Sequence, residues 1–225
     1  MQINRYLDHA VLKPQMNEQE VRAAIQVGID YKVLNVCVRP CDIRLALEMC
    51  EGTETGVICV LDFPHGDAPA EAKEALAKQY VDMGVCEIDM VLNYGYLRSG
   101  LHDQVLDGIR GVVRQARAKN ALVKVIFESG ALSTAEIQKG VALCIEAGAD
   151  FVKTSTGFGE GSATAESVRT MLDSAGGRIK VKPSGGVRNF ETAKMYVEMG
   201  AARLGVGFTS TPVICDGEGE ARDAY

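Results

Sequence analysis

The sequence contains no tryptophan, few aromatic residues (6%) and no long apolar run. None of its stretches approaches the roughly 20 apolar residues that a membrane-spanning helix needs. A secretion signal would place an apolar segment near the start, but Asp8 and His9 stand there instead. We therefore expect a cytoplasmic protein without a membrane partner.

A cluster of basic residues is also missing. The chain carries a formal net charge of −6 and has an isoelectric point near 5.2. Because a nucleic-acid interface needs a basic face, we expect no nucleic-acid partner. A local phosphate site is still compatible with this charge, since a few backbone N–H groups can hold an anion.

The cysteines indicate neither a disulfide framework nor a zinc site. There are seven of them, an odd number, and no second pair of cysteines or histidines complements Cys37 and Cys41. We therefore expect reduced thiols and no bound metal.

What the chain does contain is a recurring helix–glycine–strand pattern, in residues 23–38, 80–93, 144–156 and 196–208. Each amphipathic stretch ends at a glycine, and a short apolar run follows that glycine. The four glycines are Gly28, Gly84, Gly148 and Gly200. Glycine suits the end of a helix because it adopts the left-handed conformation without a steric clash. Further strands are predicted at about 6–10, 57–63, 122–128 and 179–184.

Strands that alternate with helices predict a parallel sheet with right-handed crossovers. Eight such units in 225 residues favour an α/β fold, a single-domain (β/α)8 TIM barrel. An open doubly wound sheet is the alternative, but the glycine-rich fingerprint that it usually carries after its first strand is missing here. We place the barrel in residues 1–214 and a flexible C-terminal tail in residues 215–225.

Three predicted strands carry charge where they should be most apolar, at Asp89, Lys153 and Lys182. A lysine inside a barrel loses solvation, which lowers its pKa, and a second ammonium nearby lowers it further. A neutral amine can attack a carbonyl to form a Schiff base, and a carboxylate can then carry a proton. Asp89 is equally well explained as a buried ion-pair partner of a lysine.

Two other strand lysines, Lys124 and Lys180, lie nearer to the predicted strand starts. We expect them to reach solvent at the bottom of the barrel. Lys153 and Lys182 differ because each precedes a loop rich in glycine and hydroxyl residues. Such loops let backbone N–H groups approach an anion closely.

Taken together, these segments resemble the deoxyribose-phosphate aldolase family, from about Leu7 to Gly207. The resemblance rests on LDHAVLKP, NVCVRP, FPHG, EIDMVLNYG, LVKVIFE, FVKTSTGF and VKPSGGVR, in the order and spacing of the family. It implies a class I lyase on a TIM barrel, without metal or cofactor. Such an enzyme reversibly cleaves 2-deoxyribose 5-phosphate to acetaldehyde and glyceraldehyde 3-phosphate.

The resemblance also implies roles for individual residues. Lys153 corresponds to the imine-forming lysine, Lys182 to the second lysine that depresses its pKa, and Asp89 to the acid/base that works through a water. Asp8 corresponds to an acidic residue bonded near the second lysine. Cys37 corresponds to a cysteine near the substrate. For Cys37 we favour a packing role, as a small residue that fills the barrel mouth, over a chemical role.

We expect the substrate to be bound mainly by glycines of the catalytic face: Gly157, Gly185, Gly186, Gly205 and Gly207. Further candidate contacts are Thr154, Ser184, Arg188 and Tyr225. Arg188 serves either an anionic substrate or a surface acid. Tyr225 ends a tail that reaches into the site in some family members, but we favour a disordered end as its explanation.

One segment departs from the family, which carries hydroxyl residues after its last strand. Here Gly205-Val206-Gly207-Phe208 lacks both hydroxyls and introduces a bulky aromatic ring. This departure motivates a second hypothesis, a Schiff-base aldolase whose acceptor aldehyde has no phosphate or binds it differently. A third hypothesis is a non-lyase barrel, an isomerase or ligand-binding protein, that keeps the lysines for ion pairs. An apolar flank with Val213 and Ile214 suggests a homodimer.

Overall fold

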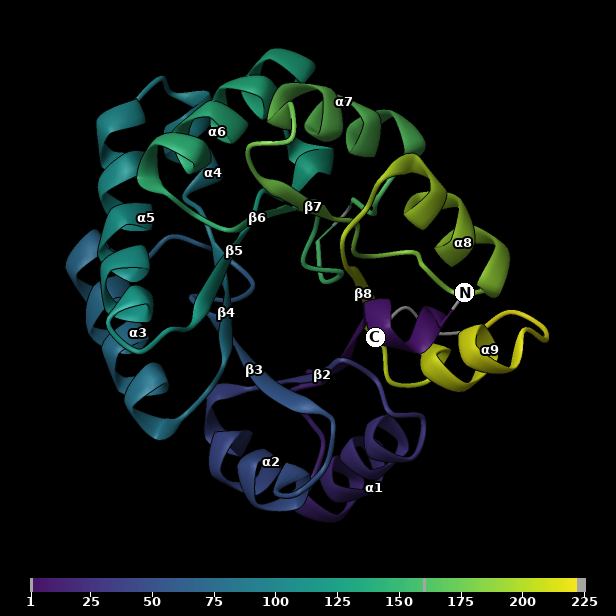
Figure 1. The fold of residues 1–225 in the computed structure, drawn as a ribbon. Helices are drawn as coiled ribbons and strands as arrows, with labels where there is room; N and C mark the ends of the chain where they lie inside the picture. The colour runs from purple at the N-terminus through teal and green to yellow at the C-terminus, as the bar shows by residue number, and fades with distance from the viewer. Residues whose placement is uncertain (1, 160, 222–225) are drawn as a thin grey trace.

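The computed structural model describes residues 2–159 and 161–221. Its eight strands form one parallel sheet in the order β7-β6-β5-β4-β3-β2-β1-β8. They are β1 Leu7–Val11, β2 Asn35–Val38, β3 Gly56–Leu61, β4 Glu87–Val91, β5 Leu122–Ile126, β6 Phe151–Lys153, β7 Lys180–Lys182 and β8 Leu204–Gly207. A bridge between Ser184 and Gly205 links the two ends of this order. The predicted (β/α)8 barrel is confirmed (Figure 1).

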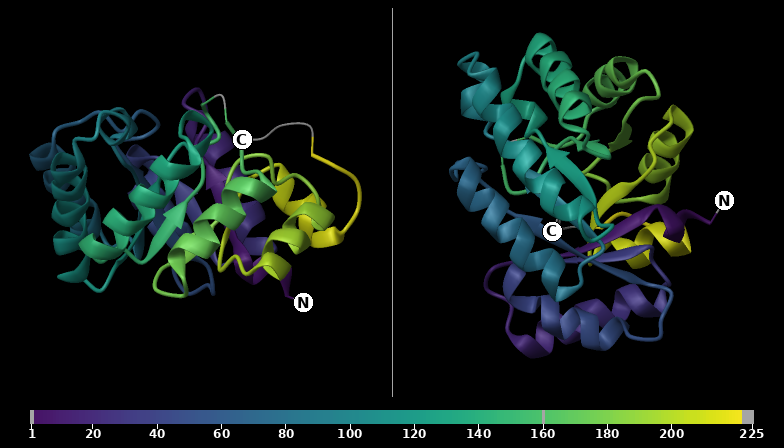
Figure 2. Two further views of the ribbon diagram at one scale, coloured as in Figure 1. Left: turned by 90° about the horizontal axis from the view of Figure 1, so that it is seen from above. Right: turned by 60° about the vertical axis from the view of Figure 1, so that its left-hand side comes forward.

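Helices surround the strands in all three views (Figures 1 and 2). They are α1 Glu18–Asp30, α2 Ile43–Cys50, α3 Ala70–Met83, α4 Tyr94–Arg98, α5 His102–Arg117, α6 Thr134–Ala147, α7 Ala165–Ala175, α8 Phe190–Met199 and α9 Ser210–Asp216. Short 3-10 helices lie at Ile3–Tyr6, Pro40–Asp42 and Ser129–Ala131. Within the described ranges, no helix is long and apolar enough to cross a membrane.

Local sequence signals explain where most helices begin and end. Asn17 and Ser133 each cap a helix through a reciprocal pair of bonds with the glutamate three residues later. Gly84, Gly148 and Gly200 end α3, α6 and α8 in the left-handed conformation, as predicted.

Gly28 does not end a helix, and this prediction was wrong. It lies inside α1, which continues to Asp30. A Cβ atom at Gly28 would lie 2.8 Å from Cγ1 of Val36 and 3.1 Å from Cδ2 of His9. Glycine is therefore needed there because α1 packs closely on β1 and β2.

The C-terminal region also differs from the prediction. Helix α9 extends to Asp216, so it includes the first two residues of the predicted tail. Ala221 is buried, and its backbone N–H donates to the carbonyl oxygen of Arg188. Ile214, expected on an exposed flank, is fully buried in the core, and Val213 is half-buried.

The imidazole of His9 is buried between β1, α1 and α9. Its Nε2 donates to the carbonyl oxygen of Ala24 at 2.9 Å, so Nδ1 accepts from Oγ1 of Thr211 at 2.8 Å. Burial lowers the pKa of His9 from 6.5 to about 4. The folded protein therefore requires the neutral ring.

We expect the protein to lose stability as pH falls from 6.5 to 4. The unfolded chain takes up a proton on His9 in this range, whereas the folded chain does not, so stability is complete above pH 6.5 and declines below it. The lowered pKa corresponds to about 3 kcal/mol in the free energy of unfolding. Urea unfolding at pH 7 and pH 4.5 measures this loss. The loss should be smaller in His9→Gln, and an equal loss in both proteins would contradict the assignment.

Candidate active site

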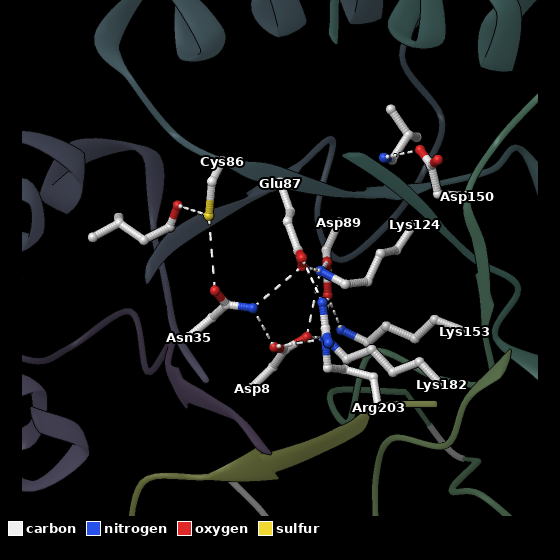
Figure 3. Close-up of polar contacts among 12 residues, drawn as sticks. Asp8, Asn35, Cys86, Glu87, Asp89, Lys124, Asp150, Lys153, Lys182 and Arg203 are labelled. Carbon is white, nitrogen blue, oxygen red and sulfur yellow. Dashed lines mark hydrogen bonds and ion pairs between the residues drawn. The ribbon is translucent and has the colours of Figure 1, made fainter. Parts of the chain in front are cut away.

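Strand register directs a group of charged side chains into the barrel. Asp89 pairs in register with Lys124, and Lys153 pairs with Lys182. Paired residues of adjacent parallel strands point to the same face of the sheet. All four side chains are buried, and Asp8 of β1 lies with them (Figure 3).

Asp89 is the centre of this group. Its Oδ2 accepts from Nζ of Lys153 at 2.8 Å and from Nζ of Lys182 at 2.7 Å. Nζ of Lys182 also donates to Oδ2 of Asp8, at 2.6 Å. The structure therefore brings together the three residues predicted to be catalytic and the predicted acidic partner of Lys182.

Lys124 belongs to the same group, so the prediction that it reaches solvent was wrong. It is fully buried, and its Nζ lies 2.8 Å from Oδ1 of Asp89 and 3.3 Å from Oδ2 of Asp8. It also forms an ion pair with Glu87. Burial alone would lower the pKa of Lys124, but the three carboxylates outweigh it and raise the pKa well above its usual value. Lys180 is exposed, as predicted.

Three further members of the network were not predicted: Asn35, Glu87 and Arg203. Nη2 of Arg203 lies 2.6 Å from Oε1 of Glu87, and its Nε lies 3.5 Å from Oδ1 of Asp8. Asn35 donates to Asp8 at 2.8 Å and to Glu87 at 3.3 Å. Glu87 lies two residues before Asp89 in β4, so strand alternation puts both side chains on the same face of the sheet. This spacing in EIDMV could have predicted Glu87 as a member of the network.

The network holds more positive than negative groups. Its carboxylates are Asp8, Glu87 and Asp89, and its cationic side chains are Lys124, Lys153, Lys182 and Arg203. Among the ion pairs of the described residues, Lys153 contacts Asp89 alone, whereas Lys182 contacts both Asp8 and Asp89. Lys153 is therefore the lysine of this network that contacts the fewest carboxylates.

Two carboxylates of this network, Asp8 and Asp89, are ionised. Burial by itself would raise the pKa of Asp89, but Lys124, Lys153 and Lys182 hold it well below its usual value. The pKa of Asp8 is lowered in the same way, chiefly by Lys124 and Lys182 against burial. Asp89 is thus an ionised ion-pair partner of the lysines.

Cys37 lies inside the barrel in an apolar cluster with Ala10, Leu12, Ile58 and Val60. Burial raises the pKa of its thiol to about 12. The thiol is therefore protonated at neutral pH, and this supports a packing role. In the ranges described, no group of three or more His, Cys, Asp or Glu residues is arranged to hold a metal ion.

The glycine-rich loops lie beyond the carboxyl ends of β6 and β7, whereas Gly205 and Gly207 lie within β8. Gly157, Gly185 and Gly186 have positive φ angles of 85°, 84° and 77°. Consecutive residues of this conformation can form a concave backbone surface that binds anions. Gly205 allows a close approach, since a Cβ atom there would lie 2.2 Å from Oγ of Ser184.

The other predicted contacts have different surroundings. Oγ1 of Thr154 donates to the carbonyl oxygen of Ser184, and the N–H of Ser184 donates back to that Oγ1, both at 2.9 Å. These bonds tie the loops after β6 and β7 together. Arg188 is half-buried, and its buried Nε has no hydrogen-bond partner among the described residues. Tyr225 lies outside the described residues.

Phe208, the bulky ring that departs from the family pattern, packs against the main core. Gly207 pairs in register with Ala10, whereas Phe208, the next residue, packs against the main core outside the barrel. Its ring lies in a hollow that α1 lines with Ala24 and Val27, and Nζ of Lys13 is 5.8 Å from the ring centroid. The inner surface at this strand is formed by Gly205 and Gly207.

Comparisons with known proteins agree with this arrangement. The sequence profile of the DeoC/LacD family aldolases matches residues 5–210. A deoxyribose-phosphate aldolase of Enterococcus faecalis is 41% identical over 98% of this chain and 99% of its own length. The structure of an aldolase called QR15 is 38% identical, with a TM-score of 0.89 over 95% of this chain and 94% of its own.

A tetrameric deoxyribose phosphate aldolase from Aeropyrum pernix is 27% identical, with a TM-score of 0.86 over 95% of this chain and 89% of its own. These matches favour a lyase over an isomerase or a ligand-binding barrel. The chain belongs to the DeoC/LacD family of aldolases.

Proposed function

We propose that this class I aldolase reversibly cleaves 2-deoxyribose 5-phosphate to acetaldehyde and glyceraldehyde 3-phosphate through an imine on Lys153. The observation that carries the assignment of Lys153 is its position in the buried network. Of the three lysines of this network, it alone is paired with a single carboxylate of the described residues. The three carboxylates of the network are already matched in number by its other three cationic groups, Lys124, Lys182 and Arg203.

The proposed chemistry begins when the neutral amine attacks the aldehyde carbon, C1, and water is lost to give the imine. The imine withdraws electrons as the C2–C3 bond breaks, while the C3 hydroxyl proton passes to a base. The resulting enamine takes up a proton at C2, and hydrolysis releases acetaldehyde. Asp89, ionised and 2.8 Å from Nζ of Lys153, is the group we assign to proton transfer, directly or through a water.

We assign the 5-phosphate to the glycine-rich loops. Gly185 and Gly186 both have positive φ angles, a turn geometry that can present backbone N–H groups to an anion, and the unpartnered Nε of Arg188 provides a cationic donor next to them in the chain. The outward position of Phe208 leaves this region open. The competing hypothesis, an acceptor without phosphate, is favoured by Gly207, which has no side-chain donor.

We expect kcat/KM for 2-deoxyribose 5-phosphate to exceed that for 2-deoxyribose by about 100-fold or more. Hydrogen bonds to a charged group contribute about 1.5–3 kcal/mol each, and one or two of them give this ratio. Arg188→Met should lower kcat/KM for the phosphorylated sugar and leave that for 2-deoxyribose unchanged. A ratio near one in the unmodified protein would rule out the phosphate site while leaving the role of Lys153 intact.

We further propose that the chain self-associates, at least to a dimer. This rests on the tetramer named for the relative from Aeropyrum pernix. Sedimentation velocity gives the mass in solution, and a monomer at micromolar concentration would contradict the proposal.

A further inference from the structure

Two phenylalanine rings meet above the carboxyl ends of the strands. The rings of Phe63 and Phe158 have centroids 5.3 Å apart and planes inclined at 83°, an edge-to-face contact. Phe63 follows β3 and Phe158 follows β6, while β4 and β5 lie between those strands in the sheet (Figure 1). The contact therefore spans the side of the mouth from which Asp89 and Lys124 project inward.

Phe63 is half-buried and covers apolar side chains of the barrel interior. It packs against the apolar cluster of Ala10, Leu12, Cys37, Ile58 and Val60, which β1, β2 and β3 or their ends contribute. Val60 and Asp89 pair in register, so apolar and charged side chains meet along the line between β3 and β4. Apolar and charged side chains thus adjoin each other inside the barrel, and Phe63 packs on the apolar cluster.

A buried lysine outside the catalytic network anchors the loop that carries Phe63. Nζ of Lys73 donates to the carbonyl oxygens of Gly66 at 2.9 Å and Val91 at 2.8 Å. It also pairs with Oδ2 of Asp62 at 2.9 Å, and the side chain of Lys73 is only 3% exposed. A buried ammonium is stable only when it is fully paired, so these bonds fix residues 62–66 relative to the end of β4.

A buried glutamate anchors the loop that carries Phe158. Oε2 of Glu128 accepts from the backbone N–H of Thr156 at 3.2 Å and from its hydroxyl at 2.5 Å. Oγ1 of Thr156 in turn accepts from the N–H of Phe158 at 3.0 Å. A Cβ atom at Gly159 would lie 2.8 Å from Cδ of Glu128, so this loop folds directly over the carboxylate.

We propose that the Phe63–Phe158 pair is a wall that determines which acceptor aldehydes reach the enamine, and that Glu128 and Lys73 are positioning residues for its two halves. The inference rests on the proposed function. In the synthetic direction, the acceptor enters from the mouth, where strands of a barrel end and its loops begin. Two rings that contact each other and are held by buried charges cannot separate freely, so they restrict the width of the acceptor.

The test compares two unphosphorylated acceptors, propanal and 3-phenylpropanal, each condensed with acetaldehyde. Phe158→Ala should raise the ratio of kcat/KM for 3-phenylpropanal over propanal by about tenfold or more, the range expected when a pocket wall is removed. Phe158 is 40% exposed, so the substitution leaves the core intact. Tyr96→Ala, which removes a similarly exposed ring (44%) from α4, is the matched control and should leave the ratio unchanged.

Glu128 is tested with two variants. Glu128→Gln keeps an oxygen that accepts both bonds from Thr156 and should retain the selectivity of the unmodified protein, whereas Glu128→Ala should shift the ratio in the same direction as Phe158→Ala. A merely destabilising effect would lower kcat/KM for both acceptors equally. If Glu128→Ala leaves the ratio unchanged, or if Glu128→Gln shifts it as strongly as Glu128→Ala does, the positioning role is wrong.

Borohydride trapping of acetaldehyde separates this proposal from the one on which it rests. Trapping on Lys153 in both the unmodified protein and Phe158→Ala, with a raised selectivity ratio, supports the wall. Trapping with an unchanged ratio overturns the wall and leaves the proposed function standing. Absence of an adduct on Lys153 in the unmodified protein overturns both.

Discussion

Lys153→Ala is expected to lower kcat for sugar-phosphate cleavage by at least about 10⁴-fold, because the only proposed nucleophile is lost. Borohydride with acetaldehyde should then trap no adduct. Alanine also leaves Asp89 with two lysine partners, Lys124 and Lys182. The buried carboxylate therefore remains compensated, and we expect the variant to fold.

Two controls separate nucleophilicity from charge in this experiment. Lys153→Arg keeps a cation next to Asp89 but cannot form an imine, so it should be as inactive as Lys153→Ala. Lys180→Ala removes an exposed lysine from the neighbouring strand β7 and should retain activity. An adduct at the normal level in Lys153→Ala would assign the imine to another lysine.

Lys124→Met is expected to lower the free energy of unfolding by about 3–5 kcal/mol, the usual effect of removing one partner from a buried ion pair. Lys124 lies against Asp8, Glu87 and Asp89 in the interior. Methionine fills similar volume but leaves these carboxylates with fewer partners. Urea unfolding measures the loss.

Two further measurements check this explanation. Adding Glu87→Gln to Lys124→Met should restore part of the stability, because one buried negative charge is removed with the positive one.

The raised pKa of Lys124 also means that its stabilising effect is complete below its unfolded pKa of about 10.4 and declines as pH rises toward the folded value. This alkaline loss should be absent in Lys124→Met, and a loss of less than 1 kcal/mol at pH 7 would contradict the role of Lys124.

The fold and the pairing of Lys153, Lys182 and Asp89 could be predicted because both depend on periodicity. Repeated strands fix the parallel barrel, and alternation fixes which side chains share a face. Lys124 could not be placed because periodicity gives the face but not the depth along the barrel axis. Register does not give this depth either, because Phe151 pairs with both Lys124 and Lys180, yet Lys124 is fully buried and Lys180 is exposed at the start of β7.

Other features depend on packing that has no period in the sequence. A glycine at position 28 is typical of a helix end. Glycine is needed there, however, because α1 packs so closely on β1 and β2 that a Cβ atom would clash. Glu128 lies just beyond β5 in the left-handed conformation, with φ of 53°, where no alternation applies. Its bonds to Thr156 arise only because the loops after β5 and β6 are adjacent.

The charged network also constrains the order in which the molecule can assemble. Asp8 comes from the first strand, and its partners Lys182 and Arg203 come from the seventh strand and from just before the eighth. A partly built barrel would hold dehydrated charges without their partners, which is strongly unfavourable. Intermediates that lack either end of the chain are therefore penalised, and the network makes barrel closure cooperative by coupling the two ends of a 225-residue chain.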